Sequence, residues 1–99
     1  MHARSGSLEV ASERLDDAIA RFEQELVPRY REQSGYKGFT MLVDRASGKV
    51  HGLSFWDSEA DMTAADSLGA EARQAFLEYS AAETEIVTKV WEVPLDDLP

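Results

Sequence analysis

The chain contains no cysteine, which excludes a disulfide, a thiolate nucleophile and any zinc or iron–sulfur site held by cysteine. Its two histidines, His2 and His51, have no aspartate or glutamate at the spacing of metal ligands on a helix, so the sequence predicts no metal site. It also lacks a Gly-rich phosphate-binding loop and a spacing that supports a Ser-His-Asp arrangement. These absences remove several common kinds of active site.

Basic residues are scarce. Ten Lys and Arg stand against 19 Asp and Glu, which gives a formal net charge of −9, and the basic residues are scattered without a run. Binding to nucleic acid or to an anionic membrane would need a basic patch strong enough to overcome the long-range repulsion of that charge. We therefore expect no nucleic-acid partner and no membrane partner.

Long apolar segments are also missing, and none is long enough to span a bilayer. Residues 1–10 lack the apolar core of a secretory signal, so we expect a cytoplasmic protein. The 99 residues are 43% hydrophobic, which favours a folded chain, and their number fits a single domain over residues 1–99. A domain of this size buries only about 60–65% of the surface of its unfolded chain, so pairing with a second copy would add to its stability.

Apolar residues at helical spacing predict two amphipathic helices. Pro28 divides the first helix, and Gly35 ends it. The second helix begins at Ser58, which resembles a capping residue with Asp61 three positions later, and Gly69 interrupts it. The apolar residues of the two helices are Leu15, Ile19, Phe22, Leu26, Tyr30, Met62, Ala65, Leu68, Ala72, Phe76 and Tyr79.

Two strands joined by a tight turn are the clearest pattern in the chain. Residues 36–44 and 49–56 are the strands, and Arg45-Ala46-Ser47-Gly48 supplies the turn. Residues 2–10 form a weaker first strand, and residues 85–93 form a β-rich last strand. The predicted order is β-α-β-β-α-β, a ferredoxin-like α+β fold with a four-stranded antiparallel sheet and both helices on one face.

The loop between the two central strands decides which side chains share a face of the sheet. An even number of loop residues places one set of side chains of residues 36–44 on the same face as one set of residues 49–56, and an odd number places it with the other set. Neither face becomes polar in either case. With an even loop, Phe39, Met41, Val43, Val50, Gly52, Ser54 and Trp56 share one face, and Gly38, Thr40, Leu42, His51, Leu53 and Phe55 share the other.

A sheet that is apolar on both faces needs cover on both. Two helices cover only one face, so the other, which carries Leu42, Leu53 and Phe55 in the even register, would stay in water. At about 25 cal/mol per Å² of apolar surface, an exposed sheet face loses many kcal/mol of burial. We therefore expect a homodimer through the sheet face, the alternative being that the C-terminal tail covers it.

Short stretches along nearly the whole chain resemble the antibiotic biosynthesis monooxygenase-like group of dimeric α+β barrel proteins. The junction from the second central strand into the second helix is the most specific of them. The stretches are Phe22 and Pro28, Gly35-Tyr36-Lys37-Gly38-Phe39, Val43-Asp44-Arg45, Ser47-Gly48-Lys49 and, at that junction, Trp56-Asp57-Ser58-Glu59. The resemblance implies a dimeric α+β barrel.

The resemblance also implies a cofactor-independent monooxygenase that acts on an aromatic or quinol-like small molecule, because in such enzymes the substrate anion itself supplies the electron to oxygen. Trp56 matches a position that contributes to their pockets, whereas Gly52 stands where they carry an Asn. His51 and Tyr79 are candidate proton acceptors, although His51 faces away from Trp56 in the even register. The expected lining of an apolar pocket beneath the helices is Phe22, Gly52, Ser54, Trp56, Met62, Phe76 and Tyr79.

The group contains other functions as well. Haem degradation would require an axial histidine on the second helix, and no histidine lies between Asp57 and Pro99. The alternative to the monooxygenase is a non-catalytic small-molecule-binding or structural member of the group, in keeping with Gly52 in place of the Asn. A cavity of a few hundred Å³ with an unpaired polar group beside Trp56 favours chemistry or binding, and a filled interior favours a structural role.

Overall fold

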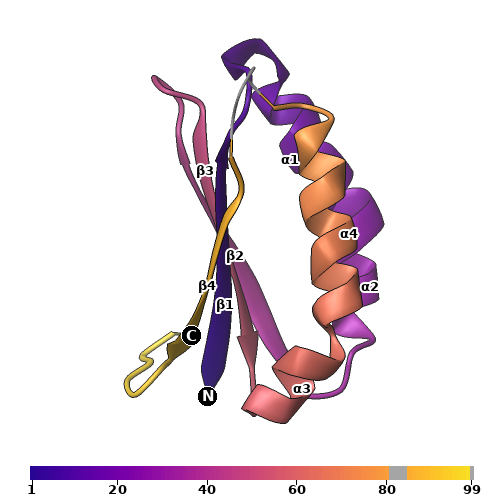
Figure 1. The fold of residues 1–99 in the computed structure, drawn as a ribbon, viewed down its shortest axis with the longest axis vertical. Helices are drawn as coiled ribbons and strands as arrows, with labels where there is room; N and C mark the ends of the chain where they lie inside the picture. Colours follow the sequence, from indigo (N-terminus) through magenta and orange to yellow (C-terminus); the bar gives the residue numbers. More distant parts are fainter. Residues whose placement is uncertain (81–84, 99) are drawn as a thin grey trace.

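The computed structural model of the chain describes residues 1–80 and 85–98. A four-stranded sheet forms one layer, and the helices form a second layer on one face of it (Figure 1). The strands are β1 (His2–Glu9), β2 (Tyr36–Asp44), β3 (Lys49–Trp56) and β4 (Val87–Glu92). They are antiparallel and lie in the order β2-β3-β1-β4, which confirms the predicted ferredoxin-like α+β fold.

The β2–β3 hairpin has the register that an even loop predicts, with Phe39 opposite Ser54. Its loop ends at Gly48, whose φ of +78° is a conformation that residues with a Cβ rarely adopt. The Gly48 carbonyl accepts a hydrogen bond from the Val10 N–H at 2.8 Å. A Cβ at position 48 would collide with the Val10 carbonyl oxygen. The turn therefore holds the end of the first strand as well as the hairpin.

The first helical segment consists of η1 (Ser12–Arg14), α1 (Leu15–Arg21), the π-helical turn η2 (Phe22–Leu26) and α2 (Val27–Arg31). The division predicted from Pro28 is present as the wide turn that precedes α2. Pro28 has no N–H to donate to the carbonyl of Gln24, so the chain lacks the bond that would hold an ordinary α-helical turn there. Beyond α2, Gly35 turns the chain into β2 with a φ of +74°.

The second helical segment consists of α3 (Glu59–Ala64) and α4 (Asp66–Leu77). It begins as predicted, because the Ser58 hydroxyl accepts the Asp61 backbone N–H at 3.1 Å. The interruption predicted at Gly69 is wrong, since the break lies at Ala65 and Gly69 is inside α4 on its buried side. A glycine at this place leaves room for polar side chains that pack against the helix.

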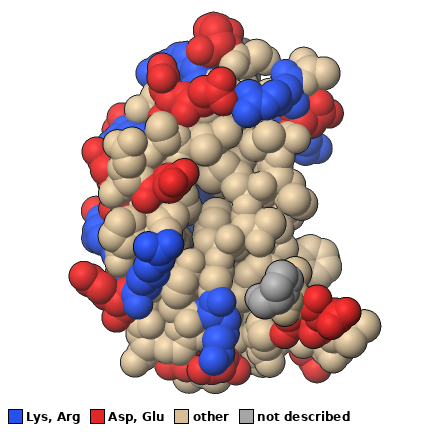
Figure 2. All heavy atoms as spheres, turned by 180° about the vertical axis from the view of Figure 1, so that it is seen from behind, with Lys and Arg blue, Asp and Glu red and all other residues tan. Residues whose placement is uncertain are grey.

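The core lies between the helices and one face of the sheet. Trp56, Leu15 and Val50 are among its most deeply buried side chains, each at most 2% exposed. In the view of Figure 2, charged side chains gather at the ends of the molecule and on its helical side, whereas uncharged atoms fill the centre. No helix within residues 1–80 and 85–98 is long and apolar enough to cross a membrane.

Candidate functional site

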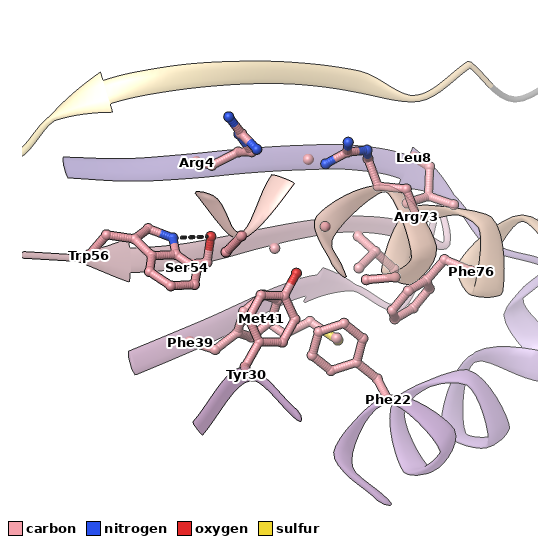
Figure 3. Close-up of a pocket in the computed structure, with 16 residues that line it drawn as sticks. Arg4, Leu8, Phe22, Tyr30, Phe39, Met41, Ser54, Trp56, Arg73 and Phe76 are labelled. Atoms are coloured by element: carbon pink, nitrogen blue, oxygen red, sulfur yellow. Dashed lines mark hydrogen bonds between the residues drawn. The ribbon is translucent and has the colours of Figure 1, made fainter. Parts of the chain in front are cut away.

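A cavity of about 60 Å³ lies between the sheet and the helices (Figure 3). Side chains from β1, β2 and β3 line one side of it, and side chains from η2, α2 and α4 line the other. A single water molecule needs at least about 10–15 Å³ of such space, so the cavity holds a few waters or one small group. It is smaller than a cavity of a few hundred Å³, and a larger ligand enters only if side chains at its edge move.

Aromatic rings form much of the apolar wall. The ring centroids of Phe22 and Phe39 are 4.6 Å apart, and those of Phe22 and Phe76 are 5.4 Å apart. Tyr30 continues the group, with its ring centroid 6.1 Å from that of Trp56. These are the separations of favourable tilted aromatic pairs. A flat ring compound in the cavity would therefore meet both faces and edges of aromatic rings.

Trp56 and Ser54 form a polar pair on the sheet side of the cavity. Trp56 is 1% exposed, and its Nε1–H donates to the Ser54 Oγ at 2.9 Å, the bond drawn in Figure 3. This bond satisfies the buried indole N–H. The Ser54 hydroxyl still has its own proton to donate, so it is the polar group beside Trp56 that a bound molecule can use.

Gly52 makes room for the ring of Phe39. A Cβ at position 52 would lie 2.9 Å from the Phe39 Cζ, closer than side-chain carbons approach one another. The Asn that the resemblance expects at position 52 would therefore displace Phe39 from the cavity wall. The chain departs from the expected pattern here by placing an aromatic ring where the group carries an amide.

Polar side chains from three elements converge on Gly69 at another side of the cavity. A Cβ at position 69 would lie 3.2 Å from the Arg73 Nη1, 3.8 Å from the Tyr30 Oη and 4.0 Å from the Arg4 Nη1. Both arginines pair with Asp66, Arg4 through a direct contact and Arg73 at 3.9 Å. Two guanidinium groups thus share one carboxylate. This end of the cavity is cationic on a chain whose net charge is −9.

The hydroxyl of Tyr30 points toward these arginines (Figure 3). It forms no hydrogen bond within the part of the chain that the structure describes. Burial raises the pKa of the Tyr30 phenol above its ordinary value of 10.0, and the positive charges of Arg73 and Arg4 oppose that rise. Tyr30 is therefore a neutral hydrogen-bond donor at neutral pH.

We expect Tyr30→Phe to reduce the loss of stability at alkaline pH. The folded protein holds the Tyr30 proton more tightly than the unfolded chain, so the unfolded chain ionises first and stability falls as the pH rises above 10.0. Below that pH both states keep the proton, and the raised pKa changes nothing. Urea unfolding at about pH 8 and about pH 11 should show a larger drop for wild type than for the variant. Equal drops in the two proteins would contradict the pKa shift.

The structure places the predicted site residues in different surroundings. Those that line the cavity are Phe22, Gly52, Ser54, Trp56 and Phe76. Met62 is in the core, 2% exposed, and is not part of the lining. Tyr79 follows α4 with the Arg14 guanidinium 4.6 Å from its ring centroid, and His51 pairs with Ser7 on the other face of the sheet. Trp56 therefore reaches the cavity, whereas His51 and Tyr79 do not, and the catalytic roles stay predictions.

The polar end of the cavity was missed in the sequence. Tyr30 fits the apolar spacing of the first helix, which indicates a core residue, and Arg4 lies in the weakest predicted strand. A signal was present in the alternation of that strand, because Arg4 falls on the same face as Gly6 and Leu8. An arginine on an inward face is uncommon and indicates a buried partner or a ligand.

Haem does not fit this cavity. Its lining contains no histidine and no cysteine to hold the iron, and about 60 Å³ is too small for the macrocycle. No group of three or more His, Cys, Asp and Glu among the described residues could hold a metal ion.

No helix of the described residues lies on the other face of the sheet, which we call the open sheet face (Figure 1). Leu42 on β2 is 55% exposed, and Trp91 on β4 is 43% exposed. The Trp91 Nε1–H donates to the Ser5 Oγ at 2.8 Å, and the Lys89 Nζ lies 4.1 Å from the centroid of the Trp91 ring. These contacts hold Trp91 on a face where Ala3 and Ser5 are buried and Leu53 and Phe55 are half-buried, so only part of the apolar surface expected there is exposed.

Comparison with known sequences finds relatives of unknown function. No family model matches the chain. Two uncharacterized proteins of Mycobacterium tuberculosis, Rv2557 and MT2634, are each 33% identical to it over 64 residues. The match covers 65% of this chain and 29% of each relative, so the chain spans less than a third of the length of these proteins.

Comparison with solved structures finds the same fold in proteins that include two oxygenases and a haem-degrader. The monooxygenase ActVA-Orf6 of Streptomyces coelicolor, in complex with nanaomycin D, has a TM-score of 0.76 and 17% identity, over 99% of this chain and 91% of that one. SnoaB, a cofactor-independent oxygenase from Streptomyces nogalater, has a TM-score of 0.68 and 12% identity, over 97% and 95%. The haem-degrader MhuD from Mycobacterium tuberculosis has a TM-score of 0.70 and 20% identity, over 97% and 98%.

Structural matches at sequence identities this low establish the fold and leave the activity open. The β2-β3-β1-β4 sheet, the helices on one of its faces and these matches over almost the whole chain agree with one another. The chain has the α+β fold of the antibiotic biosynthesis monooxygenase-like proteins, as its resemblance to that group predicted.

Proposed function

We propose that the protein is a cofactor-independent monooxygenase that acts on an aromatic or quinol-like small molecule. The main support is the cavity itself, which combines an aromatic wall with Trp56 and a cationic end. ActVA-Orf6, whose structure contains nanaomycin D, and SnoaB, a cofactor-independent oxygenase, have the same fold.

The proposed reaction inserts one oxygen atom into an electron-rich ring compound. A ring CH₂ group becomes C=O, the second atom of O₂ leaves as water, and all the electrons come from the substrate. The protein has to hold the ring, exclude water and favour the substrate anion. In this proposal the aromatic wall and Trp56 hold the ring, while the positive charges of Arg4 and Arg73 favour binding of an anionic substrate.

This assignment changes the proton acceptors expected from the sequence. His51 and Tyr79 do not line the cavity. Tyr30 lines it but keeps its own proton at neutral pH, because burial raises its pKa. None of the three is therefore assigned as the base, and in this proposal water accepts the substrate proton while the positive charges of Arg4 and Arg73 favour the anion that is left.

We also infer that two copies of the chain pair through the open sheet face, each as one domain over residues 1–99. Leu42 and Trp91 expose apolar surface on this face. The tail does not supply the missing cover, since Leu95 is 84% exposed and Leu98 is 65% exposed. A twofold dimer would bury the same patch on both copies.

Oxygen uptake with anthrone and 1,4-dihydroxynaphthalene tests the activity. We expect uptake by the purified chain without added metal or flavin, and at least a tenfold lower kcat for Trp56→Phe, about the contribution of one positioning contact. Tyr79→Phe is the matched control and should be unchanged, because Tyr79 lies outside the cavity. Uptake by wild type that does not exceed the buffer rate for either compound would contradict the proposal.

A non-catalytic small-molecule-binding or structural member of the group is the second candidate. The glycine at position 52 in place of the Asn favours a member without activity, and the volume of about 60 Å³, well below a few hundred Å³, favours the structural role. Saturable binding of a ring compound with no oxygen uptake would support this candidate and exclude the monooxygenase.

A further inference from the structure

We propose that the cationic end of the cavity, formed by Arg4, Arg73 and Tyr30, binds the carboxylate of an aromatic acid, and that Asp66 competes for the same position. This names a substrate class for the proposed monooxygenase, and it rests on that function only for the chemistry that follows binding.

The geometry of the donors carries the inference. The Arg73 Nη1, the Tyr30 Oη and the Arg4 Nη1 lie 3.2, 3.8 and 4.0 Å from the same point beside Gly69. In Figure 3 Arg4 and Arg73 lie on one side of the cavity, and Tyr30 lies with the aromatic rings on the other side and points its hydroxyl toward them. Guanidinium groups only donate hydrogen bonds, and a neutral phenol can donate one as well. A ligand group that meets all of them must accept several hydrogen bonds, as a carboxylate does.

The charges at this end are unbalanced. Elsewhere on the chain, Arg29 has a carboxylate of its own and holds Glu71 through two bonds of 3.0 and 2.8 Å. At the cavity, Arg4 and Arg73 share Asp66, and their side chains are only 18% and 25% exposed. Partly buried guanidinium groups lose hydration, which a ligand anion restores better than a neutral molecule does.

Asp66 is placed to act as a replaceable partner. Its side chain is 58% exposed, so it can turn into water without loss of packing. Exposed ion pairs contribute little net stability, and exchanging Asp66 for a ligand carboxylate therefore costs little. Asp66 is not part of the cavity lining, so the space that a ring compound needs beyond about 60 Å³ has to come from side chains that do line it, such as the two arginines.

Calorimetric titration of the full chain with 2-naphthoate and with 2-naphthamide tests the inference, because these probes differ in charge and hardly in shape. We expect the acid to bind at least tenfold more tightly than the amide, the size of a charge-assisted contact. Arg73→Gln should remove this preference. Asp66→Asn should strengthen acid binding about threefold or more, because the competing carboxylate is gone.

Two further variants separate binding from stability. Arg29→Gln removes an arginine that lies in the Glu71 pair and outside the cavity lining, so the preference should stay unchanged. Gly69→Ala should fold at least as stably as wild type, because alanine favours the helix, yet its methyl group would crowd the Arg73 Nη1 and weaken acid binding.

Equal affinities for acid and amide, no binding of either, or a preference that survives Arg73→Gln would each overturn the inference. Oxygen uptake is measured separately, so the outcomes remain distinguishable. Acid binding without uptake overturns the monooxygenase alone, whereas uptake with neutral anthrone and no acid preference overturns this inference alone.

Discussion

Leu42→Glu is expected to convert the proposed homodimer into monomers. In one copy of the chain Leu42 is 55% exposed on the open sheet face, so a glutamate there costs the monomer little. In a twofold dimer the interface would bury the new carboxylate of both copies, and an unpaired buried charge is strongly unfavourable. We expect the dissociation constant to rise by at least about 100-fold. Sedimentation velocity at micromolar concentration measures this against the 11.0 kDa mass of one chain.

Val90→Glu is the control for this experiment. Val90 is 47% exposed on β4, but it pairs with Arg4, so it lies on the face that carries the helices. The same substitution there should leave the dimer intact. If the wild-type protein sediments with a mass of 11.0 kDa, it is a monomer and the proposed dimer is wrong. Equal effects of the two substitutions would place the contact elsewhere.

Gly48→Ala is expected to destabilise the fold by about 3 kcal/mol or more. The φ of +78° is strained for alanine, and the new Cβ would collide with the Val10 carbonyl oxygen. The clash is with backbone, which cannot rotate away as a side chain does. Relief would require breaking the 2.8 Å bond from the Val10 N–H to the Gly48 carbonyl. Urea unfolding at neutral pH measures the change in free energy.

Gly38→Ala separates strain from collision. Gly38 has a φ of +152°, and nothing lies within 4 Å of the position that a Cβ would take. This variant should lose about 1–2 kcal/mol, the usual cost of such a backbone conformation. If Gly48→Ala loses no more than Gly38→Ala, the contact with Val10 does not contribute as described.

Local chemistry made most of the fold predictable. The even loop set the register of β2 and β3, because the side-chain alternation of a strand leaves only two choices and the loop length selects one. Ser58 marked the start of α3 through its cap, and Pro28 marked the irregular turn through its missing N–H. The break predicted at Gly69 failed because glycine has a low helix propensity but also makes space, and here packing decides.

The site was less predictable, since it depends on which elements dock together. The aromatic wall could be expected, because Phe22 and Phe76 lie on the inward stripes of two helices and Trp56 on the inward face of β3. His51 and Tyr79 bear suitable groups, but the sheet register and the end of α4 direct them elsewhere. The type of a side chain indicates what chemistry it can perform, and the tertiary structure decides whether it faces the cavity.

The sequence alone determined the strand and helix order, the two apolar sheet faces and the inward set of aromatic side chains, because each follows from spacing along a few neighbouring residues. Only the tertiary structure decided that Arg4 from β1 and Arg73 from α4 meet Asp66 and the Tyr30 hydroxyl beside Gly69. Arg4, Tyr30 and Arg73 lie far apart in the chain and come together only because β1, α2 and α4 pack against one another, and no local pattern in the sequence specifies that packing.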